Sequence, residues 1–186
     1  MKHLLLILFI LFSFSKINAQ IHIGETTMDY EIVRGGVTLK MNGGGVRPLL
    51  LFDLYSAGLY LKEKSKDPIA ICYENETMSI RMKITSTIVS RDIMVDAIKD
   101  GFENATNGNI TGLEDRIELI NKFYSEDITK GDILEMAYVK DKGVICMLNK
   151  NELGVIPGQD FKFALYKIWL GDKPLNKKLK KRMLGI

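Results

Sequence analysis

Histidine is scarce in this sequence, and its scarcity excludes much chemistry. Only His3 and His22 occur among the 186 residues. A Ser-His-Asp or Cys-His catalytic unit, or a histidine-based zinc site, needs a positioned imidazole. His3 lies in the leader described below, and we expect His22 in a frayed N-terminal segment. These absences argue against most hydrolase and metalloenzyme classes, and we expect neither a metal site nor a cofactor.

Cysteine is equally rare. Cys72 and Cys146 are the only two, and no CxxC pair is present, so a cysteine-based metal site is not expected. Cys146 lies in the apolar run 144–148, which is typical of a buried strand. We favour two thiols packed in the core, with a disulfide as the alternative if the chain resides in an oxidising compartment.

No excess of charge and no nucleotide loop is present. The chain holds 26 basic and 23 acidic residues, which leaves no broad electrostatic footprint for nucleic acid. The run Gly43–Gly45 lacks the GxGxxG or GxxxxGK[ST] context of a phosphate-binding loop. We therefore interpret these glycines as a tight turn or bulge, and we expect no nucleic-acid partner.

Residues 1–19 are predicted to be a secretory signal peptide. A basic start is followed by a mainly apolar run over 4–14, and Ala19 supplies the small residue for cleavage before Gln20. The alternative is a membrane anchor, but the run is shorter than the roughly 20 residues that span a bilayer. No later segment resembles a membrane span. The sequence thus predicts a periplasmic or secreted protein whose mature part, residues 20–186, is one domain.

Hydrophobic periodicity predicts strands and helices that are segregated along the chain. Residues 78–85 alternate strictly, which predicts a strand with one wet face. Short connections among the last strands predict antiparallel neighbours. The fold class is therefore α+β, with helices on one face of an antiparallel sheet. The expected strands are 37–41, 49–61, 78–85, 132–139, 143–148 and 153–156. Four helices are expected over 68–73, 90–105, 160–170 and 175–183. A further helix is expected to follow a capping box formed by Thr111 and Glu114.

Two stretches resemble a known family. Residues 43–47, Gly-Gly-Gly-Val-Arg, lead into 56–61, Ser-Ala-Gly-Leu-Tyr-Leu. Near the end, 156–161 read Ile-Pro-Gly-Gln-Asp-Phe and 168–174 read Ile-Trp-Leu-Gly-Asp-Lys-Pro. Together, in this order, they resemble exported bacterial proteins of the chalcone isomerase-like family. The resemblance implies an open-faced β-sandwich of the chalcone isomerase type, a long antiparallel sheet with helices on one face and a cleft between them.

The resemblance also implies a site at Arg47. Catalytic members of the family use an arginine, a threonine and a tyrosine to stabilise an anion. Arg47 matches the arginine, but Tyr55 stands at the threonine position and Val89, which cannot donate a hydrogen bond, at the tyrosine position. Losing one such donor lowers a rate by about 10²–10³. We therefore expect a protein without catalytic residues, the alternative being a lyase or isomerase of a chalcone-like enone with Arg47 as the electrophilic residue.

In the fatty-acid-binding branch of the fold, an arginine and a tyrosine are thought to hold the ligand's carboxylate. Arg47 and Tyr55 resemble that pair, which implies a fatty acid or similar small apolar carboxylate in the cleft. A straight strand would separate them by about 26 Å, so the chain must bend, with Pro48 and Asp53 as the expected places. The competing interpretations are an ion pair for Arg47, ordinary packing for Tyr55, and a cleft filled by the protein's own side chains.

The C-terminal segment is strongly basic. A helix is expected there, and its cations either form a solvated face or make weak contact with an anionic membrane surface. The residues concerned are Lys173, Lys177, Lys178, Lys180, Lys181 and Arg182.

Overall fold

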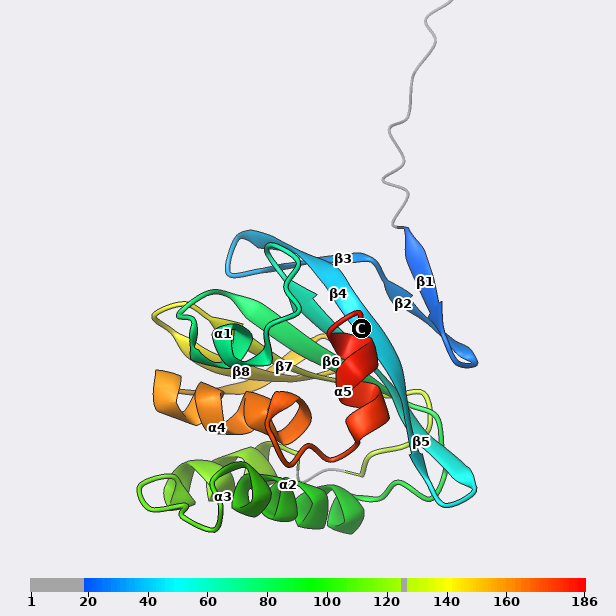
Figure 1. Cartoon of the computed structure of the whole chain (residues 1–186). Coiled ribbons are helices and arrows are strands. Elements are labelled where there is room, and N and C mark those ends of the chain that lie inside the picture. The colour runs from blue at the N-terminus through cyan, green and yellow to red at the C-terminus, as the bar shows by residue number, and fades with distance from the viewer. Residues whose placement is uncertain (1–18, 125–126) are drawn as a thin grey trace, which may run out of the picture.

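The computed structural model describes residues 19–124 and 127–186, so the predicted leader, apart from Ala19, lies outside the described residues. Its main element is a curled seven-stranded antiparallel sheet in which sheet neighbours are also neighbours in sequence (Figure 1). The strands are β3 (Glu31–Arg34), β4 (Val37–Leu49), β5 (Phe52–Leu61), β6 (Met78–Ile84), β7 (Ile133–Val139), β8 (Gly143–Leu148) and β9 (Asn151–Ile156).

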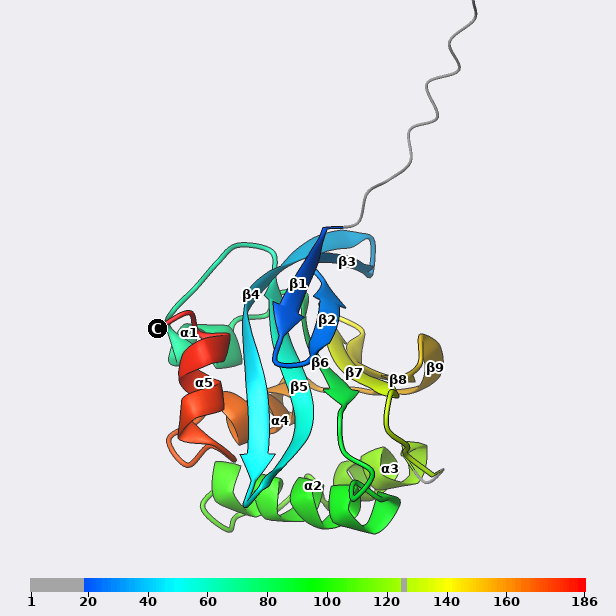
Figure 2. The same ribbon diagram turned by 90° about the vertical axis from the view of Figure 1, so that its right-hand side faces the viewer.

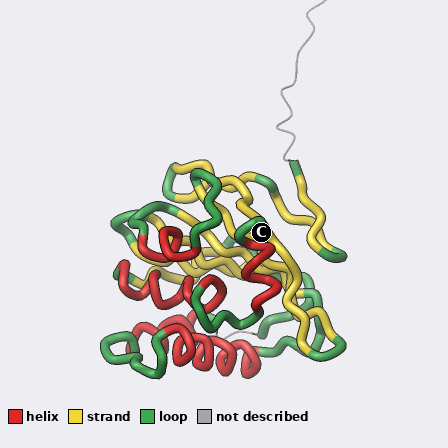
Figure 3. Tube along the Cα trace, viewed as in Figure 1, coloured by secondary structure: helices red, strands yellow, loops and turns green. Residues whose placement is uncertain are grey.

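Five helices gather on one side of this sheet (Figure 3), which confirms the predicted α+β class. α4 packs against both α1 and α2, and α5 lies along β4. Phe161, Ile168 and Trp169 of α4 are buried, as their spacing predicts. None of the helices in the described ranges is long and apolar enough to cross a membrane. The helices are α1 (Pro68–Tyr73), α2 (Arg91–Ala105), α3 (Glu114–Phe123), α4 (Gln159–Leu170) and α5 (Lys177–Met183).

The helix starts follow local capping chemistry in two of the predicted places. Asp67 accepts hydrogen bonds from the first turn of α1, and the Ser90 hydroxyl accepts one from the Ile93 amide of α2. The predicted capping box at Thr111 is wrong. The Thr111 amide donates to the Asn109 side chain, and α3 begins only after Leu113, which makes no side-chain cap.

The glycines of β4 allow close packing instead of ending a strand. β4 continues through Gly43–Gly45 to Leu49, so the expected end at Met41 is wrong. A Cβ atom at Gly43 would collide with the carbonyl oxygen of Arg182, because α5 lies directly on the strand. The predicted bulge is present: the register shifts between Met41 and Gly43, leaving Asn42 unmatched.

Three strands at the N-terminus were not predicted. β1 (Gln20–Ile23) and β2 (Thr26–Asp29) form a hairpin that lies over the face of the sheet opposite the helices (Figure 2), and β3 follows. The Ser56 hydroxyl donates to the Ile23 carbonyl at 2.9 Å, and the Tyr60 hydroxyl donates to that of Asp29 at 2.8 Å. His22 is therefore an exposed strand residue, and the expectation of a frayed terminus is wrong.

The hairpin also explains why β6 lacks the predicted wet face. Ser79 and Arg81 point away from the helices, yet Arg81 is only 3% exposed. The Oε1 atom of Glu135 accepts a hydrogen bond from Arg34 Nε at 2.6 Å and another from the Ser79 hydroxyl at 2.8 Å. Arg81 Nη1 donates to Asp29 at 3.1 Å, and its Nε lies 3.1 Å from Glu135 Oε2 at an angle too poor for a hydrogen bond. The alternation of β6 thus separates an apolar face from a buried ionic one.

Both cysteines are free and buried, which agrees with the favoured prediction of two core thiols. Burial raises the pKa of Cys72 to about 11 and that of Cys146 to about 12. The two thiols therefore stay protonated at neutral pH and behave as small apolar side chains.

Candidate functional site

Arg47 and Tyr55 are brought together by a hairpin. They occupy β4 and β5 and are direct partners in the register of the two strands. The reversal occurs at Leu50–Leu51, so the strand expected over 49–61 really begins at Phe52. The expected bend at Pro48 or Asp53 is present only as a register shift beside Pro48. A two-residue turn therefore removes the separation of a straight strand.

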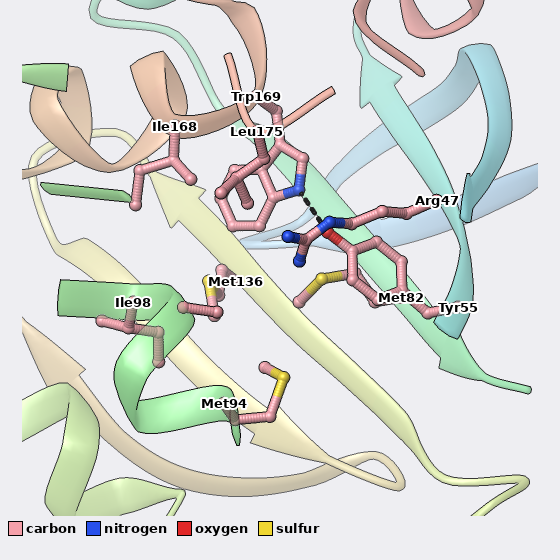
Figure 4. Close-up of a pocket in the computed structure, with 10 residues that line it drawn as sticks. Arg47, Tyr55, Met82, Met94, Ile98, Met136, Ile168, Trp169 and Leu175 are labelled. Carbon is pink, nitrogen blue, oxygen red and sulfur yellow. Dashed lines mark hydrogen bonds between the residues drawn. The ribbon is translucent and has the colours of Figure 1, made fainter. Parts of the chain in front are cut away.

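The three polar groups of the site lie in one cluster (Figure 4). The Arg47 guanidinium lies beside the Tyr55 hydroxyl, with its Cζ atom 5.7 Å from the centre of the Tyr55 ring. The Trp169 indole N–H donates to the Tyr55 hydroxyl at 3.1 Å. Among the described residues nothing accepts the Tyr55 proton in a hydrogen bond, and Arg47 forms no ion pair there. Two donors therefore remain available for an acceptor from outside.

Burial controls the protonation of Tyr55. The side chain is 2% exposed, and desolvation raises the pKa of its hydroxyl. The positive charge of Arg47 and the hydrogen bond from Trp169 oppose that rise in the pKa but do not cancel it. Tyr55 is therefore a neutral hydroxyl at physiological pH, a donor that can stand beside the permanent charge of Arg47.

Apolar side chains from the sheet and the helices enclose this cluster. Three methionines form much of the wall: Met82 from β6, Met94 from α2 and Met136 from β7. The free volume among them is about 20 Å³, which is room for roughly one water molecule. The pocket is thus narrow and largely filled by flexible side chains. Its remaining lining residues are Ala97, Ile98, Ile168 and Leu175.

Sequence reasoning placed only part of this pocket. Trp169 is buried in the core, as its spacing along α4 predicts, but nothing in the sequence indicates its hydrogen bond to Tyr55. The alternation of β6 does put Met82 on the helix-facing side. No signal in the sequence selects Met94 and Met136 from the other buried methionines, because their meeting depends on how α2 crosses the sheet. Val89 is buried and does not line the pocket.

Among residues 19–124 and 127–186, no group of three histidine, cysteine, aspartate or glutamate side chains lies in a position to hold a metal ion. The site is composed of cationic and neutral donors, which suits an anion and not a cation.

Comparison with known proteins points to one fold and one family. A family model described as chalcone isomerase-like matches residues 20–185. The crystal structure of a fatty-acid-binding protein from Arabidopsis thaliana superposes with a TM-score of 0.68, over 86% of this chain and 91% of the other, at 12% sequence identity. No curated protein sequence gives a significant match. At this identity the superposition establishes the fold, and it confirms the open-faced architecture that the sequence motifs implied.

Proposed function

Because this chain belongs to the chalcone isomerase-like family, we propose that it is a binding protein for a small apolar carboxylate such as a fatty acid. Arg47 and Tyr55 would hold the carboxylate, and the methionine-lined pocket would receive the tail. The observation on which the proposal depends is that, among the described residues, Arg47 has no carboxylate partner and the Tyr55 proton has no acceptor, although both groups lie together in an apolar pocket.

The chemistry of the donors favours an acid over a neutral lipid. A guanidinium can donate two parallel hydrogen bonds to one carboxylate, and a neutral tyrosine hydroxyl adds a third. Trp169 already donates to the Tyr55 oxygen at 3.1 Å, so the Tyr55 proton is left to point elsewhere. The structurally similar plant protein is itself named as a fatty-acid-binding protein.

The narrow pocket has to widen before it can take a ligand. A free volume of about 20 Å³ cannot hold an alkyl chain. Met82, Met94 and Met136 each have several rotatable bonds and can change rotamer at low energy. Ligand entry would therefore move methionine side chains and shift α2, which supplies Met94, Ala97 and Ile98 to the wall.

The competing function is isomerisation of a chalcone-like enone with Arg47 as the electrophilic residue. It is less well supported, because the buried Val89 replaces a hydroxyl that catalytic members use to stabilise negative charge. Flavanone formation above the uncatalysed rate, abolished in Arg47→Gln, would favour this second function.

Ligand binding can be tested by calorimetry with dodecanoate and, in parallel, dodecanol. Replacing Arg47 by Gln removes a charged donor whose hydrogen bonds contribute about 1.5–3 kcal/mol, so dodecanoate affinity should fall by about 10- to 100-fold. Dodecanol affinity should change little. Arg91→Gln, on the exposed start of α2, is the matched control. Equal loss of both ligands in Arg47→Gln, or no dodecanoate binding by the wild type, would contradict the proposal.

Export forms part of the same proposal. A binding protein with a cleaved leader would act in the periplasm or outside the cell. Expression of the full sequence in a secreting bacterial host should yield a mature protein whose intact mass corresponds to a chain that begins at Gln20.

A further inference from the structure

The turn between β4 and β5 exposes four consecutive apolar side chains, which we call the hydrophobic tip (Leu49–Phe52). Leu50 is 92% and Leu51 is 95% exposed, and Leu49 and Phe52 are 45% and 51% exposed. Single exposed leucines are common, but a contiguous exposed group of this kind usually marks a contact site. No described part of the chain covers the two leucines at the apex.

The backbone of the tip is unusual for these residues. Leu50 has a φ of 53°, in the left-handed region where glycine or asparagine is ordinarily found. A leucine there is disfavoured by local energetics, and its side chain gains nothing from packing in return because it is almost fully exposed. Strain of this sort combined with exposure is characteristic of a functional position.

The tip stands clear of the rest of the molecule. In Figure 1, β4 and β5 run together past the edge of the helical layer and turn at a point that projects from the body. The projecting shape is convex and narrow.

The charges around the tip fit an anionic lipid surface. α5 packs along β4, with Leu179 and Arg182 against Gly45. The first turn of α5, with exposed Lys177 and Lys178, therefore lies towards the tip end of β4. Asp53, the acidic residue that directly follows the tip in sequence, is exposed and so can stay hydrated.

From these observations we infer that the hydrophobic tip inserts into the surface of a lipid bilayer. Leu50 and Leu51 enter the acyl boundary, and the cations of α5 contact anionic headgroups. The inference does not depend on ligand binding. If the proposed function also holds, the strands that bear Arg47 and Tyr55 connect the bilayer directly to the pocket, so that the acid is taken from, or delivered to, the membrane.

Vesicle flotation tests the inference with phosphatidylcholine vesicles and with vesicles that also contain phosphatidylglycerol. Leu50→Asn in combination with Leu51→Ser should lower the fraction bound by about tenfold or more, since most of the inserted apolar area is lost. Asparagine tolerates the positive φ, so thermal stability should be kept or raised. Ile69→Ser, which removes a 67% exposed isoleucine on α1, is the matched control and should leave binding unchanged.

The outcomes separate the inference from its alternatives. Two results together support insertion. Binding to phosphatidylcholine vesicles should fall only in the tip variant, and binding of the wild type should rise when phosphatidylglycerol is added. All variants share the same N-terminus, so the leader cannot produce that difference. Any of three results overturns the inference. The wild-type protein does not float, Ile69→Ser lowers binding as much as the tip variant does, or light scattering shows that the tip substitutions convert a dimer to a monomer. Dodecanoate calorimetry on the same tip variant shows whether the pocket still binds ligand in solution.

Discussion

Lys162 is a buried lysine whose ammonium group stabilises the end of a helix. This α4 residue is fully buried, and its Nζ donates to the carbonyl oxygens of Ile71, Cys72 and Glu74 at 2.8, 2.8 and 2.7 Å. Those carbonyls end α1, which has no basic residue of its own in its last turn. Lys162 therefore caps a helix from a distance, and burial lowers the pKa of its amine to about 8.

Replacement of Lys162 by Met should destabilise the protein by about 1–3 kcal/mol at neutral pH, because three buried carbonyls lose their donor. The effect should depend on pH. The pKa of Lys162 is about 8 in the folded protein and 10.5 ordinarily, so between these values the unfolded chain binds a proton that the folded protein does not. The resulting contribution to the free energy of unfolding is fully present above pH 10.5 and is lost as the pH falls through 8. Urea unfolding should thus show a larger difference between wild type and variant at pH 10 than at pH 7. Lys178→Met, an exposed lysine of α5, should show neither effect.

The two residues of the candidate site could be predicted from the sequence, but the side chains that surround them could not. Arg47 and Tyr55 were identified through a family resemblance, and their contact follows from the hairpin register. Trp169 was recognised only as an apolar core position. The polar edge of a buried tryptophan has no sequence signal, since its partner is chosen by tertiary packing.

At the scale of elements, local signals located most strands and helices but misplaced the longest hairpin. Residues 143–148 form β8 as predicted, and α4 starts one residue before its predicted start. The three glycines suggested the end of a strand, whereas the real turn is made of leucines. Turn propensity mispredicts both segments. The strand contains glycines because α5 packs closely against it, and in our inference the turn contains leucines because it enters the membrane.

The packing of α5 on β4 can be tested with Gly43→Ala. The added methyl group would collide with the Arg182 carbonyl, which is backbone and cannot rotate away. Overpacking of this kind lowers the free energy of unfolding by typically 1–3 kcal/mol. Thermal unfolding should show the loss, and amide chemical shifts should change along α5. The exposed β4 residue Thr38, changed to Ala, provides the comparison. An unshifted α5 with full stability would show that the helix does not rest on the strand.

At the scale of the whole molecule, the sheet separates two different interiors. The helix side is a large apolar core, and the opposite side holds a smaller cluster of Ile23, Met28, Ile32, Leu39, Met41 and Tyr60 beside the ionic group around Glu135. The N-terminal hairpin closes this second interior. Sequence patterning could not foresee it, because a strand with alternating polar residues indicates a wet face unless something else covers that face.

Glu135 is the residue that joins the parts of this second interior. It binds Arg34 of β3 and Ser79 of β6, and Arg81 links it to Asp29 at the end of β2. Glu135→Gln should destabilise the protein by about 3–5 kcal/mol, since it leaves the buried guanidinium of Arg81 and the half-buried one of Arg34 short of negative charge. Glu152→Gln breaks a surface pair with Lys142 at 4.0 Å and should change stability by less than about 1 kcal/mol. Denaturant unfolding of both variants measures the contrast, and similar values for the two would contradict it.

Trp169 is the single tryptophan of the 186-residue sequence, and its indole N–H bonds to the tyrosine of the candidate site at 3.1 Å. The tryptophan fluorescence of this protein therefore originates at one place, beside the tyrosine that is proposed above to hold the carboxylate. Ligand entry, methionine movement or loss of the indole hydrogen bond would each alter its emission. The protein thus contains its own optical reporter, and unlabelled compounds can be screened against the native chain without a dye or a radioactive ligand.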